Sequence, residues 1–158
     1  MNNYSLRYAM KKYPILFEKY GYYPSDEITY PRHHDSSVAL ESEDNNVMFL
    51  FDCNRGDICY YIAPKSWILT YMANISRPDG KHWCNYDIIS CLLKGEDYST
   101  SFSISSSVEV VKNEYNKISR DIINNLDSLI FLFSEEKIED TQIKIAKLVG
   151  QLYRSHGM

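Results

Sequence analysis

The fold is decided by residues 47–64, which read VMFLFDCNRGDICYYIAP. Residues 47–53 are rich in strand-forming side chains, and apolar residues occupy both the odd and the even positions, which is typical of a central strand covered on both faces. The turn Asn54-Arg55-Gly56-Asp57 is typical of a tight hairpin, and residues 58–63 predict the return strand, which Pro64 ends. We therefore expect an antiparallel hairpin at the centre of a sheet.

A further strand is predicted on the N-terminal side of this hairpin. Residues 37–42 fit a strand, and the turn Glu43-Asp44-Asn45-Asn46 joins it to the central one, so that three strands form a meander. Residues 27–30 suggest a short extended piece within the preceding loop. Residues 66–75 suit either a fourth strand or a buried helix, and we favour the strand.

The first helix is predicted over residues 4–20, and Pro14 interrupts it. Either the helix kinks there or a second helix begins near Pro14, and Gly21 ends the segment. Apolar residues spaced by three and four predict its buried stripe. That stripe consists of Leu6, Met10, Tyr13, Phe17 and Tyr20.

Three more helices follow the meander. Asn85 is placed to cap a helix over residues 86–94 that ends at Gly95. A capping box at residues 106–109 precedes a long helix to residue 133, and a last helix covers residues 135–154. Because consecutive amphipathic helices with a short joint usually pack antiparallel, we expect the last two to form a hairpin.

The expected fold class is α+β, in a single globular domain over residues 1–158. An N-terminal helix, an antiparallel β-meander of three to four strands, a short helix and a C-terminal helical hairpin pack together, with the helices on the sheet. The chain has 44% hydrophobic and 24% charged residues, which are globular proportions.

The sequence also indicates the compartment of the protein and the kind of partner it binds. Residues 1–5 carry no basic segment followed by an apolar run, and the apolar stretches are too short to span a bilayer, so we expect a cytoplasmic protein with reduced cysteines and no membrane partner. The net charge of −4 argues against direct nucleic-acid binding and suits a basic protein partner.

No cofactor or metal is predicted. His33-His34-Asp35 and His82-x-Cys84 contain ligand atoms, but structural zinc sites show two close pairs such as CxxC, and the sequence has none. Cys53 and Cys59 flank the hairpin, where we expect them as cross-strand neighbours.

Catalysis has little support in the sequence. No GxSxG, HExxH or glycine-rich phosphate motif occurs. The alternative to a binding protein is a small metal-independent hydrolase or nuclease that uses histidine acid–base chemistry. Its candidate residues are His33, His34 or His82, with Lys65 or Lys81.

Carboxylates and tyrosines gather around the predicted meander, in a chain that has 14 tyrosines. Tyrosine is enriched at recognition surfaces, and carboxylates attract a basic partner. Tyr60 and Tyr61 point to opposite faces of their strand, so one of them is expected to face outward. The predicted partner-binding residues are Glu41, Glu43, Asp44, Asp52, Asp57, Tyr60 and Tyr61. The alternative is a solvated edge that charge keeps soluble.

The layout of the chain resembles another group of proteins. Tyr20-Gly21-Tyr22 ends the first helix, the strand over residues 47–53 leads into the Asn54–Asp57 turn, and Ile62-Ala63-Pro64 ends the return strand. Trp83 and Tyr86-Asp87-Ile88-Ile89 follow, and then a helical C-terminus. This layout resembles small bacterial immunity proteins of polymorphic-toxin and contact-dependent growth-inhibition systems.

The resemblance implies a protein that neutralises a cognate toxin, often a nuclease with a basic cleft, by binding it directly and without catalysis. A third hypothesis is a regulatory module that forms a homodimer through its C-terminal helices. Ile123, Ile130 and Leu132 would widen the apolar face of the long helix for that purpose.

Overall fold

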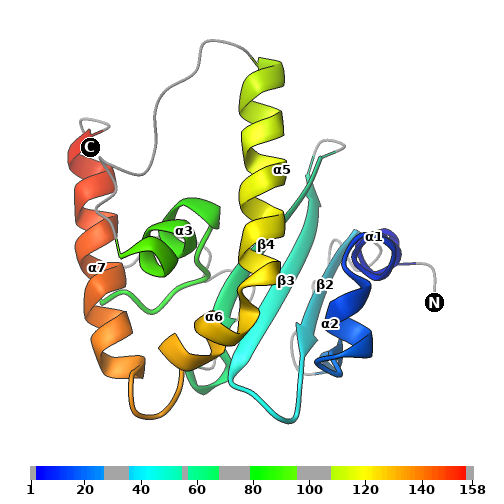
Figure 1. Cartoon of the computed structure of the whole chain (residues 1–158), viewed down its shortest axis with the longest axis horizontal. Coiled ribbons are helices and arrows are strands. Elements are labelled where there is room, and N and C mark those ends of the chain that lie inside the picture. The colour runs from blue at the N-terminus through cyan, green and yellow to red at the C-terminus, as the bar shows by residue number, and fades with distance from the viewer. Residues whose placement is uncertain (1–2, 27–35, 55–56, 68–78, 96–107, 156–158) are drawn as a thin grey trace.

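A four-stranded antiparallel sheet in the order β1-β2-β3-β4 is the framework of the computed structural model (Figure 1), which describes residues 3–26, 36–54, 57–67, 79–95 and 108–155. The strands are β1 (Tyr23–Pro24), β2 (Ser37–Glu41), β3 (Val47–Asn54) and β4 (Asp57–Pro64). The predicted meander is confirmed, and the short β1 was not predicted.

The predicted fourth strand over residues 66–75 is wrong at its start. Lys65–Trp67 forms a 3₁₀ turn directly after β4, and residues 68–75 lie outside the described ranges. The edge of β4 is paired instead by Cys84, whose N–H and C=O exchange hydrogen bonds of 2.8 and 2.9 Å with Ile62. The extended piece expected at residues 27–30 also lies outside the described part of the chain.

Both faces of the central strand are buried, as its sequence predicts. Phe49 lies opposite Ile62, and these side chains belong to the main core beneath the helices. Leu50 lies opposite Tyr61 on the other face, where Met48 and Trp83 join a second, smaller cluster. Phe49 and Leu50 both have 0% exposure, so β3 is covered on both sides.

The N-terminal helix is two helices, α1 (Tyr4–Lys12) and α2 (Pro14–Glu18), and proline is the first residue of α2. The second of the two alternatives for Pro14 is therefore confirmed. The predicted stripe is wrong within α1, because Met10 is 51% exposed while Ser5 and Ala9 are fully buried. Ser5 donates to the Ser36 carbonyl, and small side chains allow α1 to pack closely on β2 and β3.

The helix α3 (Tyr86–Lys94) begins and ends as predicted. The Asn85 side chain accepts a 3.1 Å hydrogen bond from the Ile88 amide, and Gly95 ends the helix with φ +66°. The long helix predicted to residue 133 is α5 (Val108–Asn124) and α6 (Leu126–Leu132), which separate at Asn125. The capping box lies mostly outside the described residues.

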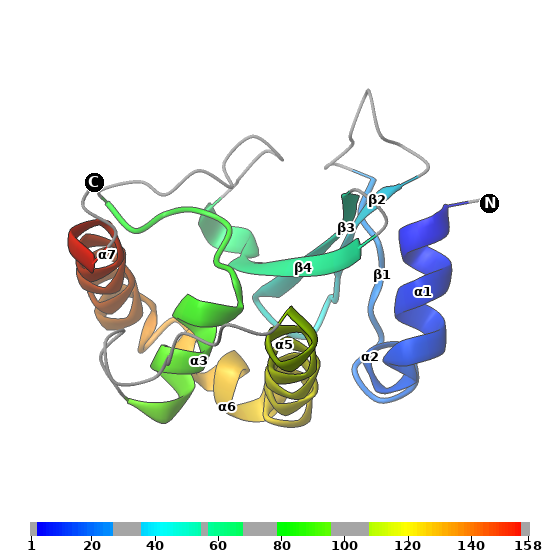
Figure 2. The ribbon, with the colours of Figure 1, turned by 90° about the horizontal axis from the view of Figure 1, so that it is seen from above.

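The last helix is α7 (Ile138–Ser155), and it forms the other leg of the predicted hairpin. Figures 1 and 2 show α3 between α5 and α7, and α3 packs against both. The helix α3 therefore lies between the two long helices of the predicted hairpin. The helices lie on one face of the sheet, and Ile89, Leu126 and Ile145 from three of them meet in the main core. The fold class is α+β, as predicted.

The segment before α3 comes very close to α7. The Gln142 side chain donates a 2.9 Å hydrogen bond to the Asp79 carbonyl. Gly80 has φ +78°, and a Cβ atom there would lie 2.5 Å from the backbone oxygen of Gln142. Only glycine, which has no Cβ atom, allows the segment to lie this close to α7.

A group of aromatic residues joins α1, the sheet and α5. The Tyr60 hydroxyl donates a 2.6 Å hydrogen bond to the Ser119 carbonyl, and the Tyr13 hydroxyl pairs with the Ser119 hydroxyl. The Tyr60 ring lies 5.2 Å from Phe51 and 5.6 Å from Phe49 between centroids. The buried phenols are thus hydrogen-bonded, and their burial does not leave a polar group unsatisfied.

Because Tyr22 is buried, we expect the folded protein to lose stability at alkaline pH. Its hydroxyl points to the Val47 carbonyl at 2.8 Å and to Asn45 Oδ1 at 2.9 Å, and burial raises the pKa of the phenol above its ordinary value of 10.0. The unfolded chain loses this proton first as the pH rises, so stability is full below about pH 10 and falls above it, by up to about 1.4 kcal/mol per pH unit for each such tyrosine.

Urea denaturation at about pH 9 and about pH 11 measures this loss. The variant Tyr22→Phe is expected to lose less stability between the two pH values than the wild type. An equal pH dependence of the two proteins would contradict the assignment to Tyr22.

Candidate protein-binding surface

The predicted acidic surface is divided between the two ends of the sheet. Glu41, Glu43 and Asp44 lie at the turn between β2 and β3. Asp52 lies near the other end of β3, opposite Ser37 and Cys59. A strand rises about 3.3 Å per residue, so the length of β3 separates the two groups by about 15–20 Å. The seven predicted residues therefore do not form one contiguous site.

Three of the predicted partner-binding residues are buried, half-buried or already hydrogen-bonded within the chain. Tyr60 is only 2% exposed and belongs to the main core, so its assignment to a binding surface is wrong. Tyr61 points to the second face, where it packs half-buried against the smaller cluster. Asp52 accepts a hydrogen bond from the Ser37 hydroxyl. The side chain of Asp57 lies outside what the structure describes.

Next to the acidic β2–β3 turn lies a tyrosine that the sequence did not single out. Tyr23 on β1 lies opposite Glu41 and is 38% exposed. Desolvation, followed by the nearby carboxylates of Glu41, Glu43 and Asp26, raises the pKa of Tyr23. A phenol is protonated at neutral pH and can donate a hydrogen bond to a carboxylate. We call Tyr23, Asp26, Glu41 and Glu43 the Tyr23 cluster.

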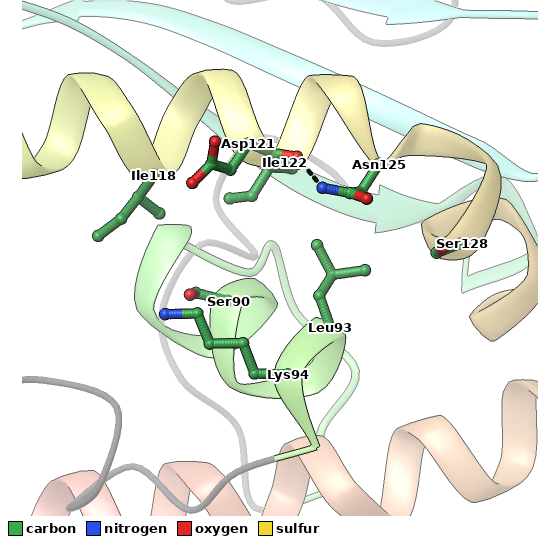
Figure 3. A pocket seen from close by; sticks show the side chains of 8 residues that line it. All are labelled: Ser90, Leu93, Lys94, Ile118, Asp121, Ile122, Asn125 and Ser128. Atoms are coloured by element: carbon green, nitrogen blue, oxygen red, sulfur yellow. Dashed lines mark hydrogen bonds between the residues drawn. The ribbon is translucent and has the colours of Figure 1, made fainter.

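A groove lies on the helical side of the molecule (Figure 3). Its deeper part is a pocket of about 220 Å³ between α3 and α5, and an open hollow of about 390 Å³ adjoins it along α6. The two parts share Leu93 and Ser128. We call both together the α3–α5 groove. It is lined by Ser90, Leu92, Leu93, Lys94, Ile118, Asp121, Ile122, Asn125, Asp127, Ser128, Phe131 and Leu132.

Hydrogen bonds connect the groove with the region of the Tyr23 cluster. The Tyr20 hydroxyl donates to Asp127 Oδ1 at 2.9 Å, and the Ser42 hydroxyl donates to the Tyr20 carbonyl at 2.9 Å. Ser42 separates Glu41 from Glu43 in the sequence. Tyr20 therefore connects an acidic residue of the groove to the acidic turn of the sheet.

His82 is the histidine that the structure describes, and its surroundings indicate a structural role. His82 is 2% exposed, and its Nδ1 lies 2.9 Å from the Trp83 carbonyl. Lys65 donates a 2.6 Å hydrogen bond to the Ser42 carbonyl. His33 and His34 lie outside the described ranges, so the arrangement needed for histidine catalysis stays a prediction.

The cysteines on the hairpin face away from each other. Cys53 pairs with Ile58 and Cys59 pairs with Asp52, so the two thiols lie on opposite faces of the sheet, and the expected cross-strand neighbours are wrong. Cys84 and Cys91 are buried, and burial raises the pKa of the Cys84 thiol. Within the described ranges, no group of three potential metal ligands comes together.

The apolar residues proposed for a dimer face do not form an exposed stripe. Ile123 is 2% exposed and lies in the main core, while Ile130 and Leu132 are half-buried against it. Among the side chains of α6 and α7 whose exposure the structure describes, the large exposed apolar ones are Phe131 at 54% and Ile143 at 69%. None of the helices, as far as the structure describes them, is long and apolar enough to cross a bilayer.

The sequence could not indicate the groove, because its residues come from α3, α5 and α6 and meet only in the folded chain. The sequence signal for Tyr23 was equally small, since a two-residue strand has no recognisable period. Comparisons with protein-family models, with curated proteins and with solved structures find no match to this chain.

Proposed function

We propose that this protein is a non-enzymatic, immunity-type protein that neutralises a basic toxin domain, of nuclease type, by binding it directly. The single observation that supports this most is the Tyr23 cluster, in which a partly exposed tyrosine on the edge strand β1 lies opposite Glu41, with Glu43 and Asp26 close by in the sequence. An exposed aromatic anchor next to carboxylates fits a partner with the opposite charge.

A solvated, protective edge is the competing explanation for this cluster. Charged residues on an edge strand prevent pairing with other sheets, and carboxylates alone would serve that purpose. An exposed tyrosine adds nothing to solubility, whereas tyrosines are enriched in the energetic centres of protein interfaces. The aromatic residue is therefore the part of the cluster that favours binding.

The proposal is tested first by protection. Coexpression with the toxin encoded beside its gene should keep host cells growing, and the purified proteins should form a stoichiometric complex. Failure of both would reject the proposed function. Protection that requires turnover of the toxin, or of a product that the toxin makes, would favour the hydrolase alternative.

The variant Tyr23→Ala is expected to bind the toxin about 30-fold more weakly, the loss typical of an interface anchor of about 2 kcal/mol. Titration calorimetry with the purified toxin domain measures this loss. The matched control is Tyr4→Ala, which removes a tyrosine that is 51% exposed on α1. Equal affinities of the two variants would place the interface elsewhere while leaving the function intact.

A further inference from the structure

We infer that the α3–α5 groove is the second half of the interface, where the basic partner inserts an arginine or lysine side chain and lays an apolar side chain on Phe131. The identity of the partner as a basic toxin rests on the proposed function. The chemistry of the occupant rests on the groove itself.

The deeper pocket combines apolar walls with a carboxylate. Leu93 from α3 points toward the stretch of α5 that carries Ile122 and Asn125, Ile118 lies at the other end of the pocket, and Asp121 projects from α5 across the pocket from Lys94 (Figure 3). Long basic side chains bury their apolar stems along such walls and keep the charged group at a polar edge. Asp121 is exposed and provides the acceptor for that charge.

The two carboxylates of the groove also suit a basic occupant. The lining contains Asp121 and Asp127 together with the ammonium group of Lys94, and the ammonium group of Lys137 lies beside Phe131. Asp127 is linked through Tyr20 to the turn that carries Glu43. We therefore expect one basic surface to contact both the groove and the region of the Tyr23 cluster.

The open part of the groove presents an exposed aromatic ring. Phe131 is 54% exposed beside Leu92 and Leu132. The ammonium group of Lys137 lies 5.8 Å from the centroid of the Phe131 ring, so the ring already lies near a cation of its own chain. A partner that lays an apolar side chain on this ring gains the burial of a large apolar surface.

A peptide titration of the whole protein tests the groove without the toxin. The probe is a twelve-residue peptide of about equal parts arginine and leucine, followed through the backbone amide signals by ¹⁵N NMR. We expect the largest shifts at Ser90, Leu93, Asp121 and Ser128. We also expect Asp121→Lys and Phe131→Ala to weaken binding about tenfold each. Shifts located elsewhere, with these amides unmoved, would overturn the inference.

Two control variants on α7 match these changes. Glu139→Lys reverses an exposed helical carboxylate, and Ile143→Ala truncates an exposed apolar side chain, both outside the groove lining. They should bind the peptide like the wild type. If they weaken binding as much as the groove variants, the peptide responds to overall charge and apolar surface, and the groove is not its site.

The same four variants, assayed for protection against the toxin, separate the two proposals. If the wild type protects and Asp121→Lys protects equally with unchanged affinity, the groove inference is wrong and the proposed function stands. If the peptide binds the groove but the wild type neither binds the toxin nor protects, the proposed function is wrong and the groove keeps its preference for basic segments.

Discussion

Replacing Gly80 by alanine is expected to destabilise the protein by about 3 kcal/mol or more. An alanine at φ +78° costs about 1–2 kcal/mol by conformation alone. Its Cβ would also lie 2.5 Å from the Gln142 carbonyl oxygen and 3.1 Å from the Ala146 amide nitrogen, which are backbone atoms of α7. Because a helix backbone cannot yield locally, α7 must shift away from α3 and from the segment before it.

The matched control is Gly21→Ala. Gly21 also has a positive φ, of +66°, but nothing lies within 4 Å of the added methyl group. This variant should lose only the conformational part, about 1–2 kcal/mol. Equilibrium denaturation of both variants measures the difference. If the two variants lost equal stability, α7 would not lie as close to Gly80 as it does in the structure.

The second large effect is expected at Tyr60, where replacement by alanine should cost about 3–5 kcal/mol. The change leaves a cavity among Tyr13, Phe49 and Phe51, whose rings pack around Tyr60 with centroid distances of 5.2–5.9 Å. It also removes the hydrogen bond to the Ser119 carbonyl. Tyr60→Phe keeps the ring and should cost only about 1 kcal/mol.

The neighbouring Tyr61→Ala is the control for Tyr60. Tyr61 lies half-buried on the opposite face, so its loss should be clearly smaller. Thermal unfolding followed by circular dichroism compares the three variants. A Tyr60→Ala protein as stable as Tyr61→Ala would contradict the placement of Tyr60 in the core.

Local patterns predicted the elements of this fold well. The apolar residues on both faces of residues 47–53 could only suit a covered strand, and Asn85 and Gly95 marked the ends of α3 through their capping chemistry. The sequence left open whether Pro14 kinks one helix or begins a second one, because both arrangements accommodate a residue without an N–H. The structure decides for the start.

Tertiary packing decided what the patterns left open. Hydrophobicity favoured Met10 for the buried face of α1, but the close approach of α1 to the sheet selects Ser5 and Ala9. The period of a strand assigns Tyr60 and Tyr61 to opposite faces and cannot say which face the helices cover. Acidic residues close in sequence lie at opposite ends of β3, and the groove lies between helices far apart in the chain.

The pairing of Tyr13 with Ser119 spans 106 positions, and this separation determines how late in synthesis the aromatic core can be completed. At about 5–20 residues per second, α1 leaves the ribosome on the order of 5–20 seconds before α5 can complete the aromatic core. Fragments that end before α5 would expose Tyr13 and Tyr60 to chaperones and proteases.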